Sequence, residues 1–261
     1  MCAYLTERAD QGMSYSTITG ACSAIGYRHR DQGLADPTAH QVVARVRRGL
    51  RRIVGVAPRR QARPLTTGDV RQILTRIDRA TAPGARDAAL ILLGFSATLR
   101  RSELVALELR DVASKPAGLL LTVRRSKADP HSAGQIVAVA AGRHADTDPV
   151  AALEQWLVVR GAQPGPLLTR VRYPDRVTCE AISGQAVATV IRSRAEAAGL
   201  PGLRITGHSL RAGHATTAAM AGVGLDRIAA QTRHCQISIL VQYYIRPLEA
   251  LADTSSRGLG L

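Results

Sequence analysis

The sequence predicts a mainly α-helical protein with one small antiparallel β-hairpin, an α+β fold in which helices dominate. Three observations support this fold class. Apolar residues recur at helical spacing, two short apolar runs flank a turn-rich segment, and residues 58–64 hold two prolines and three arginines without an apolar period. We therefore expect a helical N-terminal domain at 1–57, a linker at 58–64 and a larger domain at 65–261.

Helices are expected throughout residues 1–55. The chain opens on a segment typical of the middle of a helix, so we expect this domain to be incomplete. Ser16 and Thr17 can cap a helix that continues through Tyr27. Asp36-Pro37-Thr38 is expected to start another helix, whose apolar stripe consists of Val42, Val43, Val46 and Leu50.

The larger domain is expected to begin with a capped helix at Leu65–Asp69. Residues 86–97 are apolar almost all round, as in a buried helix, and Ser102 can cap a short helix that runs to Leu109. Residues 119–123 and 135–139 are expected to pair as a hairpin. Further helices are expected near 148–160, 184–198, 209–221, 225–232 and 237–244.

The charge balance points to an anionic partner. Lys and Arg number 35 against 20 Asp and Glu, a net charge of +15, and arginine supplies almost all of the excess. Such a balance favours nucleic acid or an anionic membrane surface, and arginine suits bidentate contact with phosphate. We expect a phosphate-facing surface on the helix near residue 50, although a solvated face is the alternative; its arginines are Arg45, Arg47, Arg48, Arg51 and Arg52.

Composition also bounds the environment of the protein. No apolar run approaches the ~20 residues that a membrane-spanning helix needs, so we expect no membrane association. The four cysteines are scattered and form no C-x-x-C pair, so neither a zinc site nor a disulfide framework is indicated. These features are typical of a cytoplasmic protein.

An ordered set of polar residues near the C-terminus carries the chemistry. His208 and Arg211 are three residues apart, which places them on one side of a helical turn. His234 follows, and Tyr243-Tyr244 begins nine residues later. Tyrosine supplies a nucleophilic phenol, arginine binds phosphate oxygens, and histidine supplies a hydrogen bond or a proton. This set predicts attack on a phosphodiester.

Five motifs in order resemble those of the tyrosine recombinases, the phage integrase family. Leu99-Arg100-Arg101-Ser102-Glu103-Leu104 resembles its first box, and Ser126-Lys127 in the hairpin resembles its catalytic lysine. His208-Ser-Leu-Arg211 matches its second box. Arg233-His234 stands where the family often has Gly-His or Gly-Trp, and a tyrosine follows. The resemblance covers about residues 65–250.

The resemblance implies a mechanism and assigns a role to each residue. Arg100 and Arg211 would clamp the phosphate oxygens, with Glu103 in support. Lys127 would protonate the leaving 5′-hydroxyl. His208 would act as general acid and base, and His234 would donate a hydrogen bond to the phosphate. Because Arg and Lys supply the positive charge, no metal and no cofactor are expected. The intermediate would be a 3′-phosphotyrosine.

Two adjacent tyrosines compete for the role of nucleophile. Spacing from His234 favours Tyr243, whereas the local sequence Tyr-Ile-Arg favours Tyr244. One residue turns a helix by about 100°, so only one phenol can face the phosphate. We prefer Tyr243, because an added residue inside the helix would disturb its buried stripe of Ile237, Leu240 and Val241.

The sequence therefore predicts a site-specific DNA recombinase or integrase of a mobile element. The resemblance implies that 1–57 is a SAM-like core-binding domain and that four subunits assemble on double-stranded recombination sites. The segment Pro247–Leu261 is expected to dock on a neighbouring subunit. Two alternatives are a type IB topoisomerase-like enzyme without partner sites and a DNA-binding homologue that has lost catalysis.

Overall fold

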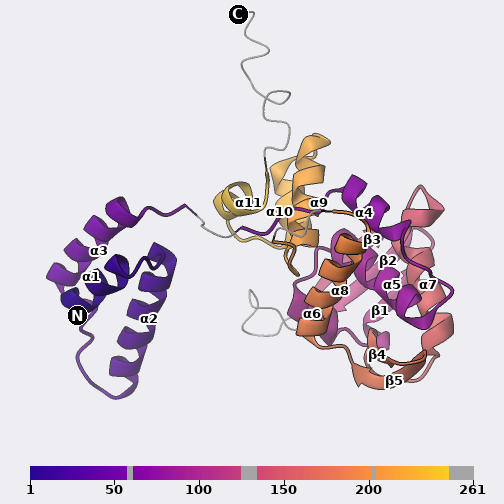
Figure 1. Cartoon of the computed structure of the whole chain (residues 1–261), viewed down its shortest axis with the longest axis horizontal. Helices are drawn as coiled ribbons and strands as arrows, with labels where there is room; N and C mark the ends of the chain where they lie inside the picture. The colour runs from indigo at the N-terminus through magenta and orange to yellow at the C-terminus, as the bar shows by residue number, and fades with distance from the viewer. Residues whose placement is uncertain (58–60, 125–133, 201–203, 247–261) are drawn as a thin grey trace, which may run out of the picture. The chain divides into compact units, whose positions relative to one another are not determined.

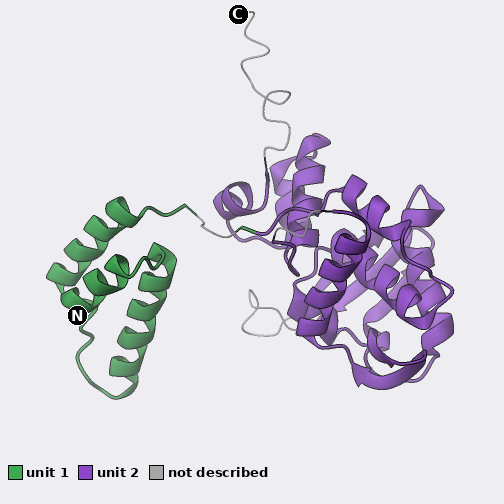
Figure 2. Cartoon of the chain, in the orientation of Figure 1, with its two compact units in different colours: residues 1–61 green, residues 62–261 purple. Residues whose placement is uncertain are grey.

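A computed structural model describes residues 1–57, 61–124, 134–200 and 204–246. The chain forms two compact units, residues 1–61 and 62–261, each with its own apolar core (Figure 2). The division falls inside the segment 58–64, where the proline- and arginine-rich composition predicts a linker.

The N-terminal unit is helical, as expected. It comprises α1 (Cys2–Asp10), α2 (Tyr15–Asp31) and α3 (Gln41–Val54) (Figure 1). The cap expected at Ser16 and Thr17 is wrong, because the Ser14 side chain accepts from the Thr17 amide and starts α2 two residues earlier. The core is small; its buried residues are Leu5, Ile18, Cys22, Val43 and Leu50.

The expected helix start at Asp36 is also wrong. The Asp36 carboxylate accepts from the backbone amide and the hydroxyl of Thr38 and pairs with Arg30, which fixes a turn instead of a helix. His40 caps α3 through a hydrogen bond from the Val42 amide. The side chain of Val42 is 49% exposed, so the apolar stripe is narrower than the sequence suggested.

The larger unit opens with two helices that the sequence predicts. In α4 (Thr67–Leu74), Thr66 and Asp69 form a reciprocal capping box. Helix α5 (Ala82–Ser96) is buried along almost its whole length, and begins before residue 86 because Thr81 caps it. The expected Ser102 cap of α6 (Arg101–Ala106) is wrong: Arg100 is the N-cap residue and its amide donates to Glu103.

The predicted hairpin is present and has a third strand. Strands β1 (Val112–Lys115), β2 (Gly118–Val123) and β3 (Gln135–Ala140) form an antiparallel sheet in that order. A second pair, β4 (Thr169–Arg172) and β5 (Arg176–Ala181), was not predicted. Strands β1 and β4 have four residues each, too few to show an alternating pattern in the sequence. Short 3₁₀ helices, η1 (Leu109–Asp111) and η2 (Ala145–Thr147), precede β1 and α7.

The remaining helices lie close to the ranges that periodicity predicts. They are α7 (Pro149–Arg160), α8 (Gly184–Ala197), α9 (Ser209–Met220), α10 (Leu225–Thr232) and α11 (Ile237–Tyr243). Helix α5 packs on α7, α8 and α9, whereas α10 packs on both α9 and α11 (Figure 1). The fold is mainly α with small antiparallel sheets, as expected. Within the described ranges, no helix is long and apolar enough to cross a membrane.

Candidate active site

The site is assembled from the ends of helices in the larger unit. Arg100 is the N-cap of α6 and His208 the N-cap of α9, with Arg211 in the first turn that follows. His234 comes directly after the C-cap of α10, and Tyr244 is the C-cap of α11.

Arg211 is buried at the centre of this group, with 1% of its surface exposed. Its Nη1 donates to the carbonyl of Thr98 at 2.7 Å, and its Nη2 donates to the carbonyl of Thr232. Burial, followed by the charge of Arg100, lowers the pKa of Arg211 to about 10. The guanidinium is therefore still charged at neutral pH. Among the described residues its Nε has no hydrogen-bond partner.

His234 is held in one orientation by its neighbours. Its Nδ1 lies 2.7 Å from the hydroxyl of Thr232, which itself donates to the carbonyl of Ile228, so Nδ1 must be the donor. Its Nε2 lies 3.4 Å from Nη2 of Arg211, a group that can only donate. Burial, and then the charge of Arg211, lowers the pKa of His234 to about 4. The ring is neutral near pH 7, with Nε2 as an acceptor.

The two tyrosines differ sharply in their surroundings. The ring of Tyr244 lies 4.4 Å from that of His234, centroid to centroid, and 5.5 Å from the guanidinium carbon of Arg211. Its carbonyl accepts from Thr216 of α9. Tyr243 is 37% exposed, and neither ring contact is made by it. Tyr244, the less preferred candidate from the sequence, is thus the one beside Arg211 and His234.

Arg100 joins the group through Glu103. The carboxylate of Glu103 accepts from the Arg100 amide at 2.8 Å and from its Nη1 at 2.5 Å. Burial raises the pKa of Glu103, but the Arg100 amide and the charges of Arg233 and Arg100 outweigh it, so the pKa lies below its ordinary value. Glu103 is therefore an anion at neutral pH, buried between guanidinium groups.

His208 lies within the electrostatic reach of three arginines. Partial desolvation, then the charges of Arg211, Arg101 and Arg100, lower its pKa below the ordinary value. The imidazole is thus neutral near pH 7, and able to accept a proton. His214, one helical turn beyond Arg211, packs edge-on against Phe95 with ring centroids 5.6 Å apart, as a structural histidine does.

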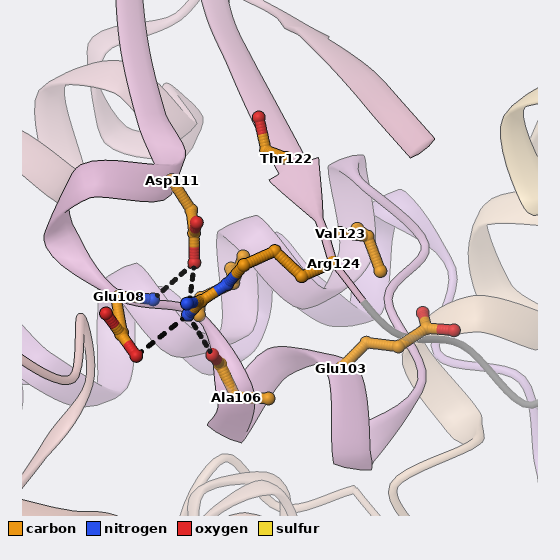
Figure 3. A pocket seen from close by; sticks show the side chains of 8 residues that line it. Glu103, Ala106, Glu108, Asp111, Thr122, Val123 and Arg124 are labelled. Atoms are coloured by element: carbon orange, nitrogen blue, oxygen red, sulfur yellow. Dashed lines mark hydrogen bonds and ion pairs between the residues drawn. The ribbon is translucent and has the colours of Figure 1, made fainter. Parts of the chain in front are cut away.

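A pocket of about 360 Å³ lies where β2 leads toward the predicted Ser126-Lys127 turn. Arg124 spans it and forms ion pairs with Glu108 and Asp111, each at 2.9 Å (Figure 3). Glu103 lines the same pocket. The strand end is therefore anchored beside the acid that holds Arg100. Lys127 itself lies outside the described residues.

The predicted DNA-contacting arginines all belong to the other unit. Arg45, Arg48, Arg51 and Arg52 are exposed on α3, whereas Arg47 is partly buried and its Nε has no partner among the described residues. In the larger unit, sequence reasoning gave no role to Thr98, Thr232 or the Arg233 side chain, because carbonyl and hydroxyl contacts of this kind leave no motif. Across the described part of the chain, no cluster of His, Cys, Asp and Glu could hold a metal ion.

Comparison with known proteins places these residues in a family. The model of the phage integrase family matches residues 63–250. An integrase/recombinase xerD homologue from Selenomonas ruminantium is 28% identical over 243 residues, which cover 92% of this chain and 71% of the relative. The recombinase Cre of Escherichia phage P1 is 25% identical over 266 residues, which cover 95% of this chain and 75% of the relative.

Solved structures share the fold at lower identity. The XerH site-specific recombinase in a post-cleavage complex with a palindromic difH substrate has a TM-score of 0.64 at 17% identity, over 93% of this chain and 67% of that chain. The XerA recombinase has a TM-score of 0.59 at 17% identity, over 98% and 80%. The chain therefore shares its fold with these recombinases.

Proposed function

The chain belongs to the phage integrase family, and on that premise we propose that it cuts and rejoins DNA strands with the phenol of Tyr244 as nucleophile. It is a tyrosine-type site-specific recombinase, a DNA-breaking and rejoining enzyme. The observation that carries the choice of nucleophile is the contact of the Tyr244 ring with His234 and with the guanidinium of Arg211.

The chemistry is a transesterification at phosphorus. The Tyr244 oxygen forms a bond to the phosphorus of a DNA phosphodiester while the bond to the 5′-oxygen breaks, which leaves a 3′-phosphotyrosine and a free 5′-hydroxyl. The phenol, with an ordinary pKa near ~10, must lose a proton, and the 5′-oxygen must gain one. In rejoining, a 5′-hydroxyl attacks the phosphotyrosine, so the bond energy is kept.

Two arginines would stabilise the transition state. Arg211 is held rigidly by the carbonyls of Thr98 and Thr232, and Arg100 is oriented by Glu103. Fixed donors of this kind act on the charge that develops on the phosphate oxygens without reorganising during the reaction. Their permanent charge also makes this stabilisation independent of pH near neutrality.

Proton transfer falls to His208 and, by the family resemblance, to Lys127. The imidazole of His208 is neutral and can accept the phenol proton. His234 would contact the phosphate. Donation from its Nε2 needs a second proton on the ring, because Nδ1 already bonds Thr232. A bound phosphate supplies the negative charge that raises the imidazole pKa and favours that proton.

The partner is double-stranded DNA that carries recombination sites. In this proposal the arginines of α3 contact the phosphate backbone, and four subunits assemble on two sites so that strands are exchanged. The tail 247–261, expected to link neighbouring subunits, lies outside the described residues. The topoisomerase-like and inactive alternatives are not favoured, because the similar proteins are named as recombinases and integrases.

Covalent capture from a randomised library tests this function and defines the target site in one experiment. The full chain is mixed with nicked duplexes whose core is randomised, and protein–DNA adducts are recovered under denaturing conditions. Recovered sequences should converge on a short motif, and two duplexes with that motif should exchange strands. Adducts without sequence preference would favour the topoisomerase-like alternative, and no adducts would favour the inactive one.

A further inference from the structure

Arg233 occupies a backbone conformation that arginine rarely adopts. It is the C-cap of α10, with φ 55° and ψ 46°, in the left-handed region where glycine carries no steric penalty. A bulky residue is strained there, and such strain persists only where the surrounding structure compensates for it. The contacts of the Arg233 side chain can supply that compensation.

Those contacts converge on one buried acid. The Arg233 side chain is only 7% exposed, and its Nη2 lies 2.5 Å from Oε2 of Glu103. The same guanidinium reaches the carbonyls of Ala97 and Thr98 at 3.3 and 3.5 Å. Burial lowers the pKa of Arg233 and the charge of Glu103 opposes that effect. A strained residue thus ties the end of α10 to the turn that precedes α6.

Glu103 is shared between two arginines. Its Oε1 accepts from Arg100, and its Oε2 accepts from Arg233 and from the Arg100 amide. The acid is 1% exposed, Arg233 is 7% exposed and Arg100 is 20% exposed at the side chain. The order of exposure makes Arg100 the outer arginine of the pair and Arg233 the inner one. Arg233 therefore holds the Glu103 carboxylate from the buried side, and the same carboxylate holds Arg100 on the exposed side.

We propose that Arg233 is a positioning residue for strand cleavage, which holds Glu103 and through it fixes the Arg100 guanidinium for the phosphate. The proposal rests on the proposed function, since it concerns the geometry of the same site. The planar guanidinium of Arg233 donates a hydrogen bond to the Glu103 carboxylate and also pairs with its charge, so both the direction and the charge of the contact matter. The shortest contact of the side chain is with Glu103, and a longer one, of 3.5 Å, reaches the Thr98 carbonyl that also accepts from Arg211. Because the side chain acts through these groups, its loss should slow cleavage without weakening DNA binding.

The decisive variant is Arg233→Gly, because glycine accepts the left-handed backbone and removes only the side chain. Arg204→Gly is the matched control: Arg204 also has a positive φ, of 65°, and loses the same charge at a site outside this group. Arg233→Lys keeps the charge without the fork. Single-turnover adduct formation and DNA affinity are measured on one captured site, and thermal melting reports folding.

We expect Arg233→Gly to form adducts at least tenfold more slowly, with DNA affinity within twofold of wild type. Arg204→Gly should match wild type, and Arg233→Lys should recover part of the rate. Glu103→Gln should also be slow, and the double variant with Arg233→Gly no slower than the slower single variant, because both act through one contact.

Several results would overturn the assignment. They are a wild-type cleavage rate in Arg233→Gly, a loss confined to affinity, or losses that multiply in the double variant. If Arg233→Gly does not fold, Arg233→Gln replaces it with the same expectation, and failure of both to fold would make Arg233 purely structural. If the wild type and Arg204→Gly form no adduct, the proposed function itself fails, and this inference with it.

Discussion

Arg211 donates a hydrogen bond to the backbone carbonyl of Thr98 at 2.7 Å, across 113 residues of sequence. Thr98 has a φ of 51°, which turns its carbonyl toward the first turn of α9. One guanidinium therefore fastens α9 to the segment that carries Arg100, and its charge lies beside the Tyr244 ring. Arg211 therefore has a structural role beside the chemical role that we propose for it.

Arg100 and Arg211 should therefore respond differently to substitution. Arg100→Ala should reduce the single-turnover cleavage rate about a hundredfold or more, because one fixed donor of this kind contributes ~2.7–4 kcal/mol to the transition state. Arg211→Ala should match that loss and also melt at a lower temperature, because the carbonyls of Thr98 and Thr232 lose their donor. Cleavage at the normal rate with collapsed DNA affinity would make both ordinary phosphate contacts.

Gly213 is required by close packing of α9. A Cβ at this position would lie 1.7 Å from the carbonyl oxygen of Leu65, a backbone atom that cannot move aside alone. Gly213→Ala should therefore destabilise the protein by ~1–3 kcal/mol or more. Gly68→Ala is the control, since its nearest atom is the Thr66 hydroxyl at 3.7 Å. Equal melting temperatures for the two variants would refute the packing argument.

Stability should fall as the pH drops from 6.5 toward 4.5. Burial is the main cause that lowers the pKa of His214, and that of His234, to about 4 from an ordinary value of 6.5. Such a histidine is neutral in both states above pH 6.5 and costs the folded state nothing there. Between 6.5 and about 4 the unfolded state binds the proton and the folded state does not, so stability falls progressively as the pH drops through this range. Glu103 also has a lowered pKa, so it titrates below this window.

Melting temperature measured across that window, in the absence of DNA, tests the prediction. His214→Gln should weaken the dependence of the melting temperature on pH, because glutamine does not titrate. A wild-type melting temperature that stays constant from pH 6.5 to 4.5 would show that neither histidine is held neutral by its burial.

DNA binding should depend steeply on salt through α3. Each phosphate neutralised contributes a slope of about −0.9 in log affinity against log salt. The combined substitution of Arg48, Arg51 and Arg52 by Gln should reduce the magnitude of the slope by about 2 to 3. Arg170→Gln, which removes an arginine paired with Glu180, serves as control. An unchanged slope in the triple variant would identify α3 as a solvated face.

Some elements could be read from the sequence because local signals agree with the fold. Helix α5 is apolar almost all round and is buried, and the Thr66 capping box starts α4 as its residues suggest. The starts of other elements depend on contacts that no local pattern reveals. Asp36 accepts a hydrogen bond from the Thr38 amide and so forms a turn. Arg100 takes the place of Ser102 as the cap of α6, because the Arg100 amide donates to the Glu103 carboxylate.

The choice between Tyr243 and Tyr244 also depends on contacts that the local sequence does not reveal. The preference for Tyr243 assumed a buried stripe of Ile237, Leu240 and Val241, which is wrong: Ile237 and Val241 are each 46% exposed, and of the three only Leu240 is buried. It also assumed that α11 continues through residue 244, so that a step of about 100° separates the two phenols. The helix ends at Tyr243, and Tyr244 has a φ of −117°, which breaks that relation. Helix ends are set by tertiary contacts such as the bond from Thr216 to the Tyr244 carbonyl. Sequence spacing alone therefore could not show which of the two rings lies beside Arg211 and His234.

The identity of the nucleophile tests the proposed function most directly. Wild type, Tyr243→Phe and Tyr244→Phe are incubated with one captured nicked site, and adducts are separated on a denaturing gel. Both variants should bind the site as wild type does, because only a hydroxyl is removed. We predict that Tyr244→Phe forms no adduct and that Tyr243→Phe forms it readily. An adduct that persists in Tyr244→Phe and disappears in Tyr243→Phe would contradict the assignment of Tyr244.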